Sequence, residues 1–176
     1  MPTNLMTFDK KKPSVYIKTF GCQMNKLDTE LFTGLLLNAG FEMVDEIDSA
    51  DIILYNTCSV RDHAEAKVYS HIGVLKGRKL KEPELIIGVL GCMAQNNGKE
   101  VFKRTSLVNL VCGTKALHKL PDYLKSIADN GKRILAVDKD QYIPIPRSAN
   151  HRSNSFQANV SIMRGCDNYC TYCIVP

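Results

Sequence analysis

Three cysteines stand close together in the last eleven residues of the chain. Cys166, Cys170 and Cys173 have the spacing Cys-x3-Cys-x2-Cys, and only Ile-Val-Pro follows them. Cysteines that merely fill a core pack singly, as small hydrophobic side chains. Three thiols this close in sequence indicate instead one face of a metal site.

Three further cysteines are far apart in sequence but occupy equivalent places. Cys22, Cys58 and Cys92 each follow the end of a predicted strand and precede a predicted helix. The carboxyl ends of parallel strands form the ligand-binding edge of an open sheet, so these thiols can converge there. Helix amino ends favour thiolates. The competing interpretation is that each is a structural cysteine, since a single cysteine at a strand end is usually buried.

The elements that position these thiols alternate between strand and helix. Strands are predicted at 14–20, 51–56, 85–90, 107–111 and 133–137, and helices at 26–39, 60–76 and 115–128. Pro121 indicates that the last helix begins there, after a turn at 115–119. Repeated strand–helix units predict an α/β fold, a doubly wound and mostly parallel sheet. Cys112 falls inside an apolar strand and is predicted to be a core thiol.

The amino-acid composition of the chain changes after residue 137. Residues 138–155 are polar and interrupted by prolines, which is typical of a linker. A new strand is predicted at 158–163, leading directly to Cys166. We therefore predict one domain at 1–137, a linker at 138–155 and the start of a second domain at 156–176.

Composition favours a cytoplasmic protein. The 176 residues are 44% hydrophobic, no stretch approaches a membrane span, and the start lacks the order of a secretory signal. In a reducing compartment, seven cysteines are metal ligands or reactive thiols rather than a disulfide framework. The net charge of +5 permits an acidic partner. The basic runs at 10–12 and 76–81 are interpreted as solvated surface or loop rather than RNA contacts.

The residues around the cysteines carry a resemblance to a known family. The matching stretches are TFGCQMN at 19–25, NTCSVR at 56–61, GCMAQ at 91–95 and VCGT at 111–114. They resemble the methylthiotransferase family of radical S-adenosylmethionine enzymes, and the residues after Cys58 resemble the MiaB type, which modifies tRNA. The resemblance covers essentially residues 14–176.

The resemblance implies two 4Fe–4S clusters. Cys22, Cys58 and Cys92 would bind an auxiliary cluster, and Cys166, Cys170 and Cys173 the cluster that binds S-adenosylmethionine, with three thiolates leaving one iron free. Tyr172 stands where the family tends to keep an aromatic side chain near the adenine, although a packing role is equally compatible with it. The competing sites at the terminal cysteines are a lone ferredoxin-like loop and a zinc knuckle, for which His151 is the nearest candidate fourth ligand.

The implied reaction is the addition of a methylthio group to carbon 2 of N6-isopentenyladenosine beside the tRNA anticodon. The implied partners are that tRNA and a flavodoxin- or ferredoxin-type reductant, and the expected state is a monomer away from membranes. The family continues after this point into a partial α/β barrel and a small β domain. We therefore expect the 176-residue chain alone not to be a competent methylthiotransferase. The alternative function is a non-catalytic iron–sulfur or electron-transfer module.

Overall fold

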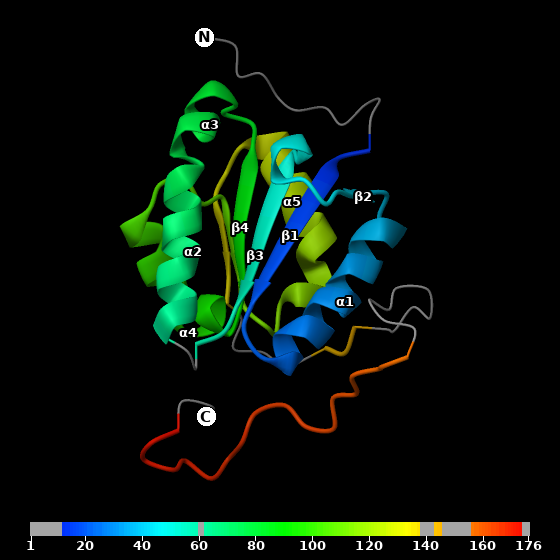
Figure 1. The fold of residues 1–176 in the computed structure, drawn as a ribbon, viewed down its shortest axis with the longest axis vertical. Helices are drawn as coiled ribbons and strands as arrows, with labels where there is room; N and C mark the ends of the chain where they lie inside the picture. The colour runs from blue at the N-terminus through cyan, green and yellow to red at the C-terminus, as the bar shows by residue number, and fades with distance from the viewer. Residues whose placement is uncertain (1–11, 60–61, 138–142, 146–155, 174–176) are drawn as a thin grey trace.

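The chain folds around one parallel sheet. A computed structural model describes residues 12–59, 62–137, 143–145 and 156–173. Within these residues six strands lie in the order β2-β1-β3-β4-β5-β6 (Figure 1), and every pair is parallel. The strands are β1 (Ser14–Phe20), β2 (Glu42–Met43), β3 (Ile52–Thr57), β4 (Ile86–Gly91), β5 (Leu110–Cys112) and β6 (Ile134–Ala136). The predicted doubly wound α/β fold is confirmed.

Helices cover both faces of the sheet. They are α1 (Gln23–Asn38), α2 (Asp62–Val74), α3 (Lys76–Lys81), α4 (Cys92–Arg104) and α5 (Leu120–Asn130), with 3-10 turns η1 (Ile47–Ser49) and η2 (Leu117–Lys119). Helices α1 and α5 share one apolar core, and α2 and α4 share the other. Because β3 and β4 lie between these two layers, all six residues of each strand are buried.

Local signals explain where the last helix begins and ends. Pro121 lies in the first turn of α5, where its missing N–H costs no helical hydrogen bond. Leu120, Leu124 and Ile127 recur at helical spacing and are buried on one face. Gly131 follows the helix in the left-handed conformation, with φ +64°, which glycine adopts without strain. The predicted start near Pro121 is confirmed.

Three local expectations differ from the structure. The two-residue strand β2 was not predicted, and the basic segment 76–81 forms the helix α3 rather than a loop. The predicted strand at 158–163 is wrong: residues 156–173 contain no strand. An extended segment becomes a strand only when a neighbouring strand pairs with its N–H and C=O groups. Val160 and Ile162 are instead 70% and 97% exposed.

The predicted linker is described only at residues 143–145. There Ile145 is 7% exposed and packs into the core that α1 and α5 share. The rest of that segment, including His151, lies outside the described residues. The domain boundaries remain a prediction.

Candidate metal centre

The register of three neighbouring strands brings their carboxyl ends side by side. Phe20 of β1 pairs with Thr57 of β3, and Thr57 pairs with Gly91 of β4. A cysteine follows each strand end directly or after one residue. We call Cys22, Cys58 and Cys92 the first triad. The strand order reverses between β1 and β3, and such a reversal is where ligands bind in open α/β sheets.

Each cysteine of the first triad precedes a helix, as predicted. Cys22 is the N-cap of α1, and Cys92 is the first residue of α4. The third helix, α2, begins at Asp62, shortly after Cys58. Helix amino ends carry a partial positive charge and unpaired N–H groups. This edge of the sheet therefore suits a negatively charged group.

Two glycines allow the strand ends to pack closely. A Cβ atom on Gly21 would lie 2.9 Å from the Cβ atom of Cys58. A Cβ atom on Gly91 would lie 2.5 Å from the carbonyl oxygen of Thr57, and the φ of Gly91 is +91°. Neither position has room for a larger side chain. The absence of a side chain at these two glycines therefore permits the close backbone approach.

Two buried asparagines fasten the strand ends together. Asn25 and Asn56 are 1% and 0% exposed. The Nδ2 of Asn25 donates to Asn56 Oδ1 and to the Thr57 carbonyl, each at 3.1 Å, while its Oδ1 accepts from the Cys22 N–H at 3.2 Å. Asn56 Nδ2 donates to the Asn25 carbonyl at 2.8 Å and to Thr29 Oγ1 at 3.0 Å. Satisfied buried amides of this kind fix one geometry.

The surroundings of the Cys92 thiol disfavour its ionisation. Burial, and then the charges of Cys58, Asp28 and Cys22, raise the pKa of the Cys92 thiol to about 11, while Arg164 acts in the opposite direction. Burial therefore disfavours the thiolate of Cys92 in the metal-free chain. A metal must displace this proton to bind the Cys92 sulfur.

The donor set of the first triad consists of three thiols. In the described residues, no three His, Cys, Asp or Glu side chains gather closely enough to hold one metal ion. All-thiol ligation on a closely packed frame is typical of iron–sulfur sites. The residues present therefore fit a cluster.

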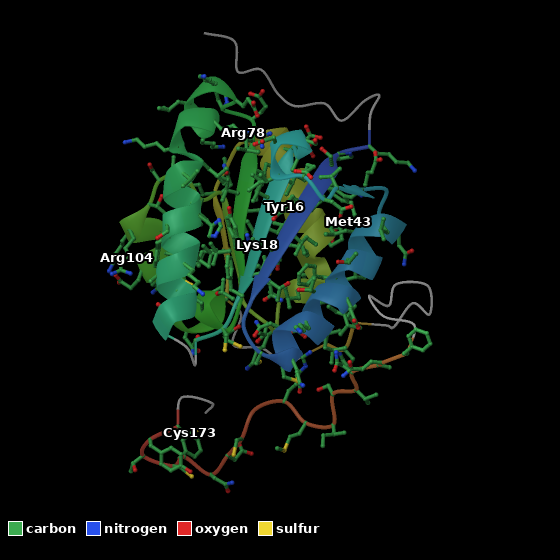
Figure 2. All side chains as sticks on the ribbon, viewed as in Figure 1. Tyr16, Lys18, Met43, Arg78, Arg104 and Cys173 are labelled. Carbon is green, nitrogen blue, oxygen red and sulfur yellow. The ribbon has the colours of Figure 1, made fainter. Side chains whose placement is uncertain are left out.

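The terminal cysteines occupy a different setting. We call Cys166, Cys170 and Cys173 the second triad. Cys166 is half-buried, whereas Cys170 and Cys173 are exposed. The Cys173 N–H donates to the Cys170 carbonyl at 2.9 Å, which turns the short loop on itself. Figure 2 shows Cys173 on a segment that runs apart from the strands, and Tyr172 beside it is 91% exposed.

The remaining candidate residues lie elsewhere. Cys112 is fully buried in β5, which confirms it as a core thiol. Arg78 of α3 lies at the opposite end of the sheet (Figure 2) and donates to the carbonyl groups of Ile47 and Ala50 at 2.6 and 2.7 Å. Its guanidinium thus binds the protein's own backbone.

Sequence reasoning assigned no role to Asn25, Asn56, Asp28 or Arg164. A signal was present for two of them. Asn25 and Asp28 are three residues apart, and Phe32 follows four residues later, so all three lie on one helix face. That face is buried. Polar residues on the buried face of a helix need partners, which points to a hydrogen-bonded site.

Comparison with known proteins assigns the chain to a protein family. Residues 14–113, which contain the first triad and its frame, match the sequence pattern described as uncharacterized protein family UPF0004. The chain belongs to this family. The UPF0004 match ends within the sheet domain, before the second triad.

Named relatives of this UPF0004 chain match a larger share of it than the family pattern does. Each is called tRNA-2-methylthio-N(6)-dimethylallyladenosine synthase. The Clostridium botulinum (strain Hall) protein is 43% identical over 92% of this chain and 36% of its own length. The Clostridium tetani protein is 44% identical over 98% and 39%, and the Rhodopirellula baltica protein 41% over 93% and 37%. The resemblance to tRNA methylthiotransferases is confirmed, and the chain spans less than two fifths of these relatives.

No helix among the described residues is long and apolar enough to cross a bilayer.

Proposed function

We propose that this chain is the cluster-binding part of a tRNA methylthiotransferase. The first triad holds an auxiliary 4Fe–4S cluster, and the second triad holds a second 4Fe–4S cluster together with S-adenosylmethionine. The observation that supports this most is the register that aligns Phe20, Thr57 and Gly91, because it delivers three thiols to one edge of the sheet. The names of the relatives supply the reaction class.

When bound, the clusters and S-adenosylmethionine supply the radical and the methylthio group that is transferred to carbon 2 of N6-isopentenyladenosine in tRNA. The chain's own residues hold and orient these groups. Asn25 fixes the start of α1 below Cys22, and burial of Cys58 keeps water from one side of the first triad. Tyr172, exposed beside Cys173, is the candidate contact to the adenine of S-adenosylmethionine.

The proposal extends to partners and compartment. The substrate is a tRNA carrying N6-isopentenyladenosine, and a flavodoxin- or ferredoxin-type protein supplies electrons. The protein acts in the cytoplasm as a monomer. The tRNA substrate rests on the relatives' printed names, whereas the reductant, the compartment and the monomeric state rest on the composition and on the residues that match the family's motifs.

Iron counting on single-cysteine variants tests the proposal. The full chain is reconstituted anaerobically with iron and sulfide, then analysed by metal and sulfide assays and Mössbauer spectroscopy. We expect about eight irons in the wild type and about four in either Cys22→Ala or Cys170→Ala, because each substitution removes a ligand of one cubane. Cys112→Ala is the matched control, a buried thiol outside both triads, and should keep all the iron. Stoichiometric zinc that survives both ligand substitutions would contradict the proposal.

The alternative is a cluster-binding or electron-transfer module without catalysis. The exposure of Cys170 and Cys173 is the observation that favours it, since exposed clusters exchange electrons readily with partner proteins. Dithionite reduction in the presence of S-adenosylmethionine separates the two functions. Release of 5′-deoxyadenosine by the reconstituted chain supports the radical chemistry, whereas stable reduction without cleavage supports the module.

A further inference from the structure

A carboxylate is buried close to the first triad. Asp28 lies on α1, one turn after Asn25, and is 3% exposed. Its charge acts on the Cys92 thiol, so the two groups are within electrostatic reach. An ionised carboxylate withdrawn from water is costly unless a partner compensates it. The fold of the sheet domain therefore demands a cation at this place.

That cation comes from the segment that carries the second triad. Arg164 lies 136 residues away in sequence and two residues before Cys166. Its Nη1 donates to Asp28 Oδ2 at 3.3 Å, and its Nη2 donates to Asp28 Oδ1. The guanidinium fork thus engages both carboxylate oxygens, a geometry that lysine cannot reproduce. Side-chain exposures of 19% for Arg164 and 4% for Asp28 separate this pair from ordinary surface ion pairs.

The rest of the terminal segment makes little contact with the sheet domain. Phe156 and Ile162 are 98% and 97% exposed. Within 156–173, only Asn159, Arg164 and Cys166 are partly buried, and the other residues are exposed. Burial in this segment is therefore concentrated at Arg164 and at the first cysteine of the second triad. In Figure 1 the segment, coloured orange to red, runs past the end of the sheet from which α1 starts.

We propose that Asp28 and Arg164 form a positioning pair that holds the loop of the second triad beside the first triad. Neither residue is a metal ligand. The pair acts through Cys166, because fixing Arg164 restricts where a cysteine two residues later can lie. That the two triads carry clusters rests on the proposed function, whereas the pair itself exists in the metal-free chain.

Trypsin provides a direct test on the metal-free full chain. Cleavage at the Arg164–Gly165 bond requires the Arg164 side chain to leave Asp28. We expect Asp28→Asn to speed this cleavage at least tenfold, because the amide cannot pair with the guanidinium as an ion. The matched control is Asp129→Asn, which changes an exposed carboxylate at the end of α5 and should leave the rate unchanged.

A conservative variant keeps the test decisive if Asp28→Asn fails to fold, which circular dichroism would show. Arg164→Lys retains the charge and the tryptic site but loses the fork, so cleavage after residue 164 should become faster than in the wild type. Alkylation of Cys166 by iodoacetamide should rise toward that of Cys170 in both variants. Wild-type cleavage at Arg164 as fast as at exposed lysines, or no change in either variant, would overturn the proposal.

The reconstituted chain adds a spectroscopic readout. If the pair sets the separation of the clusters, electron paramagnetic resonance of the reduced wild type should show magnetic coupling that weakens in Asp28→Asn at equal iron content. Unchanged coupling contradicts a positioning role. Failure of the wild type to bind iron would refute the proposed function but not the tryptic result, so the two failures are distinguishable.

Discussion

Each triad presents three thiols, but the two triads are held by different kinds of structure. The first triad is assembled by the fold, from three strand ends joined by buried amides around Asn25 and Asn56. The second is assembled by the sequence, on one short loop with two of its cysteines exposed. The first can form only when the sheet is correct, whereas the second needs only local turns. Damage to the sheet should therefore disable the first triad and spare the thiols of the second.

The largest expected effect on the first triad comes from substituting Gly91. Gly91→Ala places a Cβ atom 2.5 Å from the Thr57 carbonyl oxygen and from Asn56 Oδ1, at a φ of +91°. We expect a loss of about 3–5 kcal/mol in the free energy of unfolding, because strain and overlap with backbone add. Urea unfolding of the metal-free chain measures it.

The control for this substitution is Gly40→Ala. Gly40 has nearly the same φ, +93°, but nothing lies within 4 Å of its Cβ position. It should lose only about 1–2 kcal/mol, the cost of the left-handed backbone. Equal losses in the two variants would show that close packing at the first triad contributes nothing.

Asn25 gives the next largest effect. Asn25→Ala leaves Asn56 Oδ1 and the Cys22 N–H without this partner, so we expect a loss of about 2–3 kcal/mol and weaker iron binding at the first triad only. Asn96→Ala is the control, since Asn96 also donates a hydrogen bond, to Ser59 Oγ at 3.2 Å, but is exposed. It should change stability by less than about 0.5 kcal/mol. Iron titration of both variants checks whether the frame serves the metal site as well as the fold.

The sheet could be predicted because its signals are local. The apolar runs of β3 and β4 are typical of strands buried on both faces, and Pro121 marks the start of α5. The convergence of the first triad followed from the equivalent places of its cysteines. β2 went unpredicted because two residues show no periodicity. Segment 158–163 was misassigned because its apolar residues suggest a strand, while pairing depends on a neighbour that local sequence does not reveal.

The polar contacts that hold the site in place could not be predicted from the sequence. The Asn25–Asn56 pair depends on how the first turn of α1 packs against the end of β3, 31 residues away in sequence. Asp28 and Arg164 meet across 136 residues and between two predicted domains. Hydrophobic periodicity fixes which face of an element is buried, but it does not choose a polar partner on another element.

Removing one cysteine from each triad sharpens the comparison further. Cys58 is 2% exposed, so Cys58→Ala should destabilise the metal-free chain by about 1–2 kcal/mol through lost packing. Cys170 is exposed, and Cys170→Ala should change stability by less than about 0.5 kcal/mol. Thermal unfolding followed by circular dichroism compares them. A larger loss in Cys170→Ala than in Cys58→Ala would contradict the division between a fold-built and a sequence-built triad.

The smallest expected effect is a pH dependence of stability that arises from Cys92. Its thiol pKa is raised from 9.0 to about 11, chiefly by burial. Below pH 9 the folded and unfolded states both hold the proton; between pH 9 and 11 the unfolded chain loses it first, so stability falls as pH rises. Because the thiol is only partly buried, we expect this loss to stay within about 1 kcal/mol. Urea midpoints of the metal-free wild type should fall more steeply across this range than those of Cys92→Ser, which has no thiol to ionise. Equal slopes would show that the Cys92 thiol ionises as easily in the folded chain as in the unfolded one. The fold would then not keep this ligand protonated in the absence of a metal.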